Sequence, residues 1–545
     1  MGISKIKVQN FKRLRCFECK FEKGINTIVG DNEAGKSTIL EAIHLALTGM
    51  YCGRGIRNEI SPYLFNNDAV NEYLNSLKSG SPIEPPAISI EVFFDGSIDP
   101  NFEGNGNSDG GDKIEGFIFR IAFSDQYQPE YETLIKSETV SSLPTEYYVP
   151  TWTSFSRNGG ITTKTIPIKS LLVDSSNYRY QNGSDVYISR IVKNLLDSDD
   201  IISISQAHRK MIEGFASDET IKSINEKISA ESTIIKEKVS LSADLGTKNA
   251  WENSLVTQVA GVPFAYIGKG AQCIVKTELA LNHKRAQNAE IILLEEPESH
   301  LSFSRLSELI CMIGTKYGDR QIIVSTHSSF VANKLGLANL CVLKESNILR
   351  MTDIPSSDFF RKMPGYDTLR LILCKKAILV EGPSDELIVQ RAYMDHHSGR
   401  LPIDDGIDVI SVGLSFLRFL EIAYRLNVIT YVVTDNDGDV AALEKKYADY
   451  IGEKASPNIT LCYDTCVDGL DMPDHKEYNY NTLEPKLLKM NNLALFNEIF
   501  GTAFADETKL RYYMKSHKTE CALAIFDSEK KISYPQYILK AVCYE

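Results

Sequence analysis

The segment Gly30–Ser37, GDNEAGKS, constrains the fold of this chain more than any other feature. It fits the pattern G-x-x-x-x-G-K-[ST], and it lies between an apolar run at 25–30 and a segment at 37–49 with helical spacing of apolar residues. A loop between a strand and a helix can cradle phosphates with backbone N–H groups and the helix N-terminus, which an ordinary Gly-rich turn does not offer. The chain is therefore expected to be an α/β protein with a P-loop.

The residues of this loop have expected roles toward ATP. Lys36 would reach the β- and γ-phosphates, and Ser37 would bind Mg²⁺. The other residues expected to bind the nucleotide are Gly30, Asn32, Gly35 and Thr38.

An acidic pair follows a second apolar run, in IILLEEPESHL at 291–301. Glu295 would take the metal-side role usually held by Asp, and Glu296 would orient or deprotonate the attacking water. An exposed acidic helix start is the competing interpretation. A further expected strand ends in STHS at 325–328, where His327 could sense the γ-phosphate or be only structural.

A long separation between Ser37 and Glu295 indicates an insertion in the P-loop domain. Residues 181–255 are rich in Lys, Glu, Ser and Ile and are expected to be helical. Ile221 and Ile224 would share one face, but charged residues interrupt the heptad, so a long coiled coil is not supported.

This arrangement resembles the ABC-type ATPases of the RecF/SMC class. Asn10-Phe11-Lys12 is similar to the motif in their first strand, and GKGAQ at 268–272 is similar to a degenerate Gly-rich signature. The resemblance implies a composite site, in which Gly268 and Gly270 of one subunit close on ATP held by another. It therefore implies a homodimer or higher homo-oligomer, with the helical insertion mediating dimerisation; a plain turn at 268–272 is the alternative.

Carboxylates follow two expected strands of a second α/β segment. Glu381 ends the run ILVE and Asp385 lies in the next turn, whereas Asp435 and Asp437 follow the run ITYVVT. Parallel strands bring such ends to one crevice, where carboxylates repel one another unless cations intervene. Mg²⁺ or Mn²⁺ suits these oxygen ligands, and two ions could clamp the attacking and leaving oxygens of a phosphodiester. Each Asp alone could instead be a helix cap or turn residue.

Glu381-Gly-Pro-Ser-Asp385 followed by Asp435-x-Asp437 resembles the Toprim pattern. An ABC-type P-loop ATPase with a helical insertion, followed by a Rossmann-like Toprim domain, resembles the OLD (overcoming lysogenization defect) family. The resemblance implies that Glu484 adds a metal ligand and that Lys518 neutralises transition-state charge, with Lys515 as a competing candidate. Lys515 and Lys518 would share a face if their segment were helical.

The family resemblance implies an ATP-binding and ATP-hydrolysing, metal-dependent DNA endonuclease with a role in antiphage defence, as in Gabija-like or retron-linked systems. An accessory defence protein or an RNA or DNA component would be a further partner. The expected parts are 1–180 and 256–370 for the ATPase, 181–255 for the insertion and 371–545 for Toprim. The competing hypothesis is an ATP-gated DNA-binding or scaffold protein with a non-catalytic Toprim domain.

The composition of the chain limits which kinds of partner it can bind. The chain has 59 Lys and Arg against 72 Asp and Glu, a net charge of -13, so any DNA contact must come from a local positive strip. With 43% hydrophobic residues, global disorder is excluded. No transmembrane run or signal peptide is recognised, so a cytoplasmic protein without membrane partners is expected. Cys16 and Cys19 lack a second zinc-ligand pair, which favours free thiols.

Overall fold

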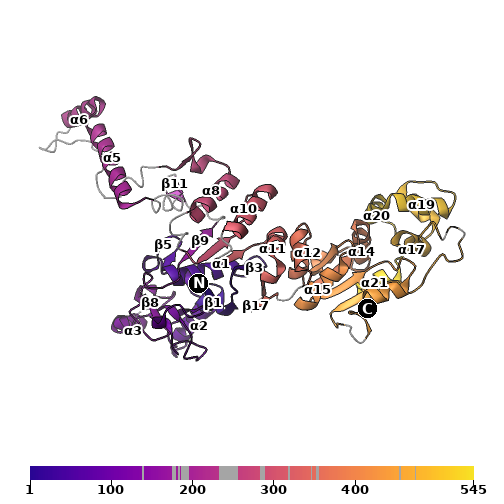
Figure 1. Ribbon diagram of the computed structural model, residues 1–545, viewed down its shortest axis with the longest axis horizontal. Coiled ribbons are helices and arrows are strands. Elements are labelled where there is room, and N and C mark those ends of the chain that lie inside the picture. Colours follow the sequence, from indigo (N-terminus) through magenta and orange to yellow (C-terminus); the bar gives the residue numbers. More distant parts are fainter. Residues whose placement is uncertain are drawn as a thin grey trace. The chain divides into compact units, whose positions relative to one another are not determined.

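The computed structural model describes most of the chain (Figure 1), namely residues 1–137, 140–174, 180–181, 184–185, 196–231, 256–282, 289–316, 320–344, 347–351, 355–452, 456–472, 474 and 476–544. Contacts between residues divide it into two compact units. The first comprises Met1–Ile28, Asn32–Thr326 and Glu345–Ile348. The second comprises Val29–Asp31, His327–Lys344 and Leu349–Glu545.

An antiparallel sheet in the order β2-β1-β6-β7-β8 forms one part of the first unit. Its strands are β1 (Ile3–Phe11), β2 (Leu14–Lys20), β6 (Ile88–Phe94), β7 (Gly116–Phe123) and β8 (Tyr148–Ser154). Strands β6 and β7 pair antiparallel, with Ile90 opposite Phe119. Both side chains are fully buried, as expected for one face of a half-buried sheet.

A parallel sheet carries the P-loop of the same unit. Strands β3 (Ile25–Gly30), β15 (Gln321–Ser325), β14 (Ile291–Glu295) and β9 (Ser170–Asp174) lie in this order and are all parallel. Helix α1 (Lys36–Thr48) contacts β9 and β14. Ile291–Leu294 are fully buried, which explains their continuous apolar sequence. Because the strands are parallel, the P-loop after β3 and the acidic pair after β14 lie at the same edge of the sheet.

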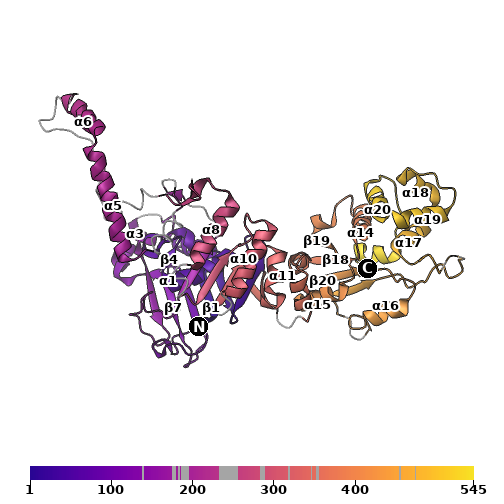
Figure 2. The ribbon, with the colours of Figure 1, turned by 45° about the horizontal axis from the view of Figure 1, so that its top comes forward.

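Two helices, α5 (Ser198–Ser217) and α6 (Glu219–Glu231), form most of the described part of the insertion. Figures 1 and 2 draw them as a pair in magenta, and the two helices contact each other. The helical prediction is confirmed for 198–231. Gln181 and Ser184–Asp185 instead belong to the short strand pair β10 (Tyr180–Gln181) and β11 (Ser184–Asp185), and residues 182–183, 186–195 and 232–255 lie outside the described part. The other helices of this unit are α2 (Asn67–Lys78), α3 (Gln128–Ser137), α8 (Lys269–Asn282) and α10 (Phe303–Lys316).

The second unit contains a parallel sheet in the order β19-β18-β20-β21. Its strands are β18 (Lys376–Val380), β19 (Ile407–Ser411), β20 (Ile429–Val433) and β21 (Ile459–Cys462), three of which are labelled in Figure 2. Ala377 and Leu379 belong to one apolar cluster and Ile378 and Val380 to another, so successive side chains pack on opposite faces. The predicted βα series from 377 to 435 is thereby confirmed as a Rossmann-like sheet buried on both faces.

Helices surround this second sheet. They are α14 (Pro383–His396), α15 (Phe416–Leu426), α16 (Val440–Lys446), α17 (Leu483–Met490), α18 (Leu493–Phe500), α19 (Glu507–Ser516), α20 (Lys518–Asp527) and α21 (Gln536–Cys543). The unit also includes α11 (Ser329–Leu335), β16 (Leu340–Lys344), α12 (Ser357–Lys362) and α13 (Thr368–Leu373). None of the helices in the described ranges is long and apolar enough to cross a membrane.

Candidate functional site

The P-loop has the backbone that phosphate binding requires. Gly35 has a φ of 102°, which L side chains rarely adopt, and it immediately precedes the first residue of α1. Lys36 and Thr38 are buried and Ser37 is half-buried, whereas Asn32 is exposed. The N–H groups at the start of α1 therefore face the turn that Gly35 makes, which is a ready anion site.

The acidic pair lies at the end of β14. Glu295 pairs in register with Ser325 of β15, and the Glu296 N–H donates to the Ser325 carbonyl at 3.0 Å. Glu296 has a φ of 43°, an unusual conformation for a non-glycine residue, and its carboxylate accepts from Ser299 Oγ at 3.3 Å. The chain therefore breaks out of the strand at Glu296, which fixes that carboxylate at the sheet edge shared with the P-loop.

Two glycines of the predicted signature differ in their surroundings. A Cβ on Gly270 would lie 2.6 Å from the carbonyl oxygen of His300, so only glycine allows α8 to approach the loop after the acidic pair. A Cβ on Gly268 would meet nothing within 4 Å. Gln272 is buried and donates to the Phe264 carbonyl at 2.7 Å. Gly270 thus has a packing role inside its own subunit, and Gly268 retains open space.

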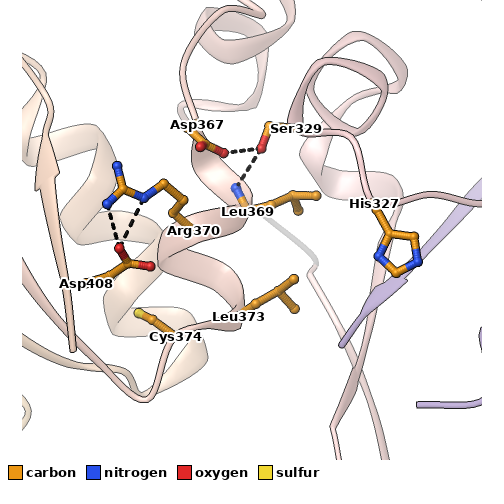
Figure 3. A pocket seen from close by; sticks show the side chains of 8 residues that line it. All are labelled: His327, Ser329, Asp367, Leu369, Arg370, Leu373, Cys374 and Asp408. Atoms are coloured by element: carbon orange, nitrogen blue, oxygen red, sulfur yellow. Dashed lines mark hydrogen bonds and ion pairs between the residues drawn. The ribbon is translucent and has the colours of Figure 1, made fainter. Parts of the chain in front are cut away.

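His327 follows β15 and lines a cleft of about 370 Å³ in the second unit (Figure 3). The other lining residues are Ser329, Asp367, Leu369, Arg370, Leu373, Cys374 and Asp408. Arg370 on α13 donates to Asp408 on β19 at 2.5 and 3.1 Å and to the Val409 carbonyl at 3.0 Å. The cleft therefore extends from the residue predicted to sense nucleotide to a strand of the second sheet.

A buried polar clamp joins α11 to α13. Asn333 donates to the Tyr366 carbonyl at 2.7 Å and accepts from Thr368 Oγ1 at 2.6 Å, and both side chains are fully buried. One turn earlier, Ser329 Oγ donates to Asp367 and accepts from the Leu369 N–H at 3.3 Å. The helix that follows His327 is therefore bound at two points to the segment that carries Arg370.

The predicted Toprim carboxylates come from separate elements of the second unit. Glu381 directly follows β18, and its carbonyl accepts from the Gly413 N–H at 3.0 Å. Asp385 lies in the first turn of α14 and accepts from the Gly382 N–H at 3.0 Å, so it acts as a helix cap. Asp435 follows β20, and Glu484 lies in the first turn of α17.

Mutual repulsion marks these carboxylates as one cluster. Burial, and then the charges of Glu381 and Glu484, raise the pKa of Asp385 to about 6, against the opposing effects of Gly382 and Lys518. Burial also raises the pKa of Asp435 well above its usual range, with added repulsion from the other four carboxylates, Asp437 included. Four other carboxylates thus act electrostatically on Asp435.

Lys518 brings the positive charge of this cluster. Its Nζ lies 3.2 Å from Glu484 Oε1, and Glu484 is only 5% exposed. Burial lowers the pKa of Lys518, but Glu484, Asp435 and Asp385 together raise it above its usual value. The shared helix face expected for Lys515 and Lys518 is wrong, because α19 ends at Ser516 and α20 begins at Lys518. Lys515 instead lies over the Tyr478 ring, 5.4 Å from its centroid.

The chemistry of this cluster suits a divalent cation, but the carboxylates are not already arranged as a set of metal ligands. All five donors are carboxylates, whose repulsion a cation would offset. Yet within the described ranges no three His, Cys, Asp or Glu side chains are close enough to hold a metal ion. Protein groups hold the carboxylates instead: the Leu483 N–H donates to Asp435 at 3.2 Å and Asn479 donates to Asp437 at 3.0 Å.

Sequence reasoning missed the residues that support this cluster. Asn436, between the two aspartates, donates to the carbonyls of Asp464 and Cys466 at 2.5 and 2.9 Å. Lys486 is buried and donates to Asp464 and Asp468, each at 2.6 Å. Asn436 could have been suspected from its place in the D-x-D motif. Lys486 depends on contacts with a distant loop, for which the local sequence carries no signal.

Comparisons with known proteins agree with the fold of both parts of the chain, the ATPase and the Toprim domain. A family model described as "AAA domain" matches residues 5–291, and a second AAA-domain model matches residues 279–333. The model "Overcoming lysogenization defect protein-like, TOPRIM domain" matches residues 372–437. These matches define an AAA/ABC-type ATPase fused to an OLD-like Toprim domain. The chain belongs to the OLD family.

Similar proteins cover only parts of it. A Rad50 ATPase for DNA double-strand break repair from Methanopyrus kandleri is 49% identical over 45 residues, 8% of this chain and 5% of that protein. The DNA replication and repair protein RecF of Shewanella pealeana is 31% identical over 107 residues, 19% of this chain and 28% of that protein. The matched segments therefore span only a small part of these relatives.

Solved structures give weaker similarity. The Smc head domain of Pyrococcus furiosus, bound to the C-terminal domain of ScpA, has a TM-score of 0.34 at 14% identity, covering 66% of this chain and 99% of that one. A RecF–ATP structure has a TM-score of 0.32 at 12% identity, covering 64% and 98%. These values are too low to support a functional argument.

Proposed function

We propose that this protein is an ATP-binding and ATP-hydrolysing DNA endonuclease whose Toprim domain hydrolyses phosphodiesters with divalent metal ions under control of the ATPase. The observation that carries the proposal is the group of carboxylates around Asp435, which comes from four separate elements and has Lys518 in its midst. A structural role does not require several carboxylates to gather around Asp435, because their repulsion destabilises the folded state.

In the proposed site, the carboxylates of Glu381, Asp385, Asp435, Asp437 and Glu484 would hold Mg²⁺ or Mn²⁺. The bound ions would supply the electrophilic and water-activating chemistry of phosphodiester hydrolysis. Lys518 would then balance the charge that develops on the phosphate, because its ammonium already lies beside Glu484.

In the proposed ATPase, the P-loop binds the nucleotide through Lys36 and the N–H groups of its glycine turn. Ser37 and Glu295 would hold the Mg²⁺ of the nucleotide, Glu296 would act on the water and His327 would sense the γ-phosphate. Support comes from the common sheet edge of β3 and β14 and from the backbone break at Glu296.

The wider proposal concerns assembly and biology. A composite site with Gly268 from a second subunit requires a homo-oligomer, which the insertion at 181–255 would hold together. The ATPase would occupy 1–180 and 256–370, with Toprim at 371–545. DNA is the proposed substrate and antiphage defence in the cytoplasm the proposed setting, with an accessory protein or nucleic acid as a further partner.

A second candidate is an ATP-gated DNA-binding or scaffold protein with a non-catalytic Toprim domain. Two observations favour it: the Glu484 carboxylate is already paired with Lys518, and no carboxylate trio within the described residues is set to hold a metal ion.

Incubation of the purified chain with supercoiled plasmid separates the two candidates, with Mg²⁺ or Mn²⁺ and with or without ATP. Nicking should be lost in Glu381→Ala and Asp435→Ala, by roughly a hundredfold or more, because each removes charge stabilisation of several kcal/mol. Asp358→Ala, an exposed carboxylate paired with Arg361 on α12, is the matched control and should nick normally. Full nicking by both cluster variants would reject the nuclease proposal.

A further inference from the structure

Two exposed leucines stand on fixed turns beside the carboxylate cluster. Leu414 is 79% exposed and follows β19, and Leu470 is 71% exposed and follows β21. These are the two outer strands of the parallel sheet, whereas Glu381 and Asp435 follow the two inner strands. Because the carboxyl ends of parallel strands meet at one edge, the Leu414 turn lies beside the carboxylates, and contacts through 479–481 bring the Leu470 turn to Asp437.

The first turn is held to the cluster by its backbone. The Gly413 N–H donates to the carbonyl of Glu381, and the Ser415 N–H donates to the carbonyl of Val412 at 3.1 Å. Val412 and Ser415 are buried on either side of the exposed residue. The turn is therefore anchored at both ends and presents one apolar side chain to solvent next to Glu381.

The second turn is held through the segment 479–481. Asn479 donates to Asp437 at 3.0 Å, and two residues later Asn481 accepts from the Asp468 N–H at 2.7 Å. A Cβ on Gly469 would lie 2.3 Å from the Tyr480 ring, so this backbone packs tightly on the ring. Leu470 is thus joined to Asp437 by a short chain of fixed contacts.

We infer that Leu414 and Leu470 are wedges that enter the base stack of duplex DNA on either side of the scissile phosphate. This inference rests on the proposed nuclease function and adds a substrate requirement, a locally unstacked duplex. Single leucines on a surface need no explanation by themselves, but these two lie beside the carboxylates on anchored turns. A protein partner would need a continuous apolar area, which the exposed carboxylates of Glu381 and Asp437 interrupt. Insertion between base steps requires only one apolar side chain at each point.

A fluorescence experiment tests the inference without cleavage. Duplex DNA with 2-aminopurine along one strand is mixed with the full-length protein in Ca²⁺, and binding is followed separately by anisotropy. Wild-type protein should raise the 2-aminopurine fluorescence as bases unstack, and Leu414→Ala/Leu470→Ala should lose most of that rise while still binding. Ile403→Ala removes a leucine-sized side chain that is 60% exposed before β19, at the opposite edge, and should behave as wild type.

A cleavage experiment in Mg²⁺ or Mn²⁺ provides the second arm. The double variant should cut fully paired duplex about tenfold more slowly than wild type, but should cut a duplex with mismatches at the mapped cleavage site at nearly the wild-type rate. Three results would contradict the inference that the two leucines act as wedges. They are equal slowing of the double variant on both substrates, binding by the wild type without a fluorescence rise, and no binding to duplex DNA. A fluorescence rise without any cleavage by the wild type would instead reject the nuclease function and support the inference that the leucines enter the base stack.

Discussion

Lys518 Nζ lies 3.2 Å from Glu484 Oε1, at the first residue of α20, whereas Lys515 near the end of α19 lies over the ring of Tyr478. The two lysines are three positions apart in sequence, but only Lys518 is a member of the carboxylate cluster. Burial, and then repulsion between carboxylates, raises the pKa of Asp385 and Asp435, and the charge of Lys518 opposes the shift at Asp385. This placement separates the two candidates that the sequence left open.

We predict that Lys518→Ala lowers the rate of DNA cleavage by roughly a hundredfold while the affinity for DNA changes little, because the ammonium acts where charge develops. Lys515→Ala is the matched control, and its cleavage rate should fall far less. Single-turnover cleavage and anisotropy binding measure the two effects. Unchanged cleavage in Lys518→Ala would make this residue only a structural partner of Glu484.

We predict different nucleotide defects for two residues of the first unit. Lys36→Ala should weaken ATP binding, because the buried ammonium is expected to contact the phosphates directly. Glu296→Gln should bind ATP and stall its hydrolysis, because that carboxylate is expected to act on the water. Binding of a fluorescent ATP analogue and phosphate release provide the measurements.

Lys23→Ala, an exposed lysine beside β3, is the control for the charge change at Lys36. ATP turnover that persists in both Lys36→Ala and Glu296→Gln would contradict the assignment of the ATPase site.

Most of the fold could be predicted from local patterns in the sequence. The apolar runs at 291–294 and 377–380 are the buried parallel strands that their composition predicts, since both faces of each sheet are covered. The motifs also located Asp435 and Glu381 correctly at strand ends. These features depend on residues within a few positions of one another, which is the range over which periodicity is informative.

The unpredicted features depend on contacts between distant segments. The break between α19 and α20 at His517 has no Gly or Pro to announce it, so a continuous helix was the natural expectation for Lys515 and Lys518. The sequence predicts that Gly270 contacts nucleotide, but the His300 carbonyl also requires a residue without a Cβ at this position. A close contact between segments that are distant in the sequence does not affect the local spacing of residues, so sequence patterns do not predict it.

We predict that the clamp between α11 and α13 transmits the nucleotide state to the nuclease site. Asn333→Ala would leave the Thr368 hydroxyl and the Tyr366 carbonyl without their partner in a buried environment, at a cost of about 1–3 kcal/mol for each. The ratio of cleavage rates with and without ATP should therefore move toward one, in whichever direction ATP acts.

Thr368→Val removes only one of these hydrogen bonds and should shift the ratio and the melting temperature less. An unchanged ratio in an Asn333→Ala protein with lowered melting temperature would show that the clamp stabilises the unit without coupling the two activities.

The final prediction concerns DNA binding, for which the net charge of -13 is unfavourable. The carboxylate cluster repels phosphate, so a bound cation has to reverse the local charge before DNA can approach. Specific binding should therefore require divalent metal and should be abolished by EDTA. Asp435→Asn removes one of the proposed metal ligands, so it should raise the amount of metal needed for DNA binding, and cleavage should be lost.

The salt dependence of this binding measures how many DNA phosphates the protein contacts. Each neutralised phosphate contributes about -0.9 to the slope of log affinity against log salt, so a protein with only a few cations at the site should show a slope of roughly -3 to -4. Loss of Lys518 should make that slope less negative by less than one contact, because Glu484 already engages its ammonium. Metal-independent binding, or a slope of about -10, would instead indicate an extended basic surface elsewhere on the protein.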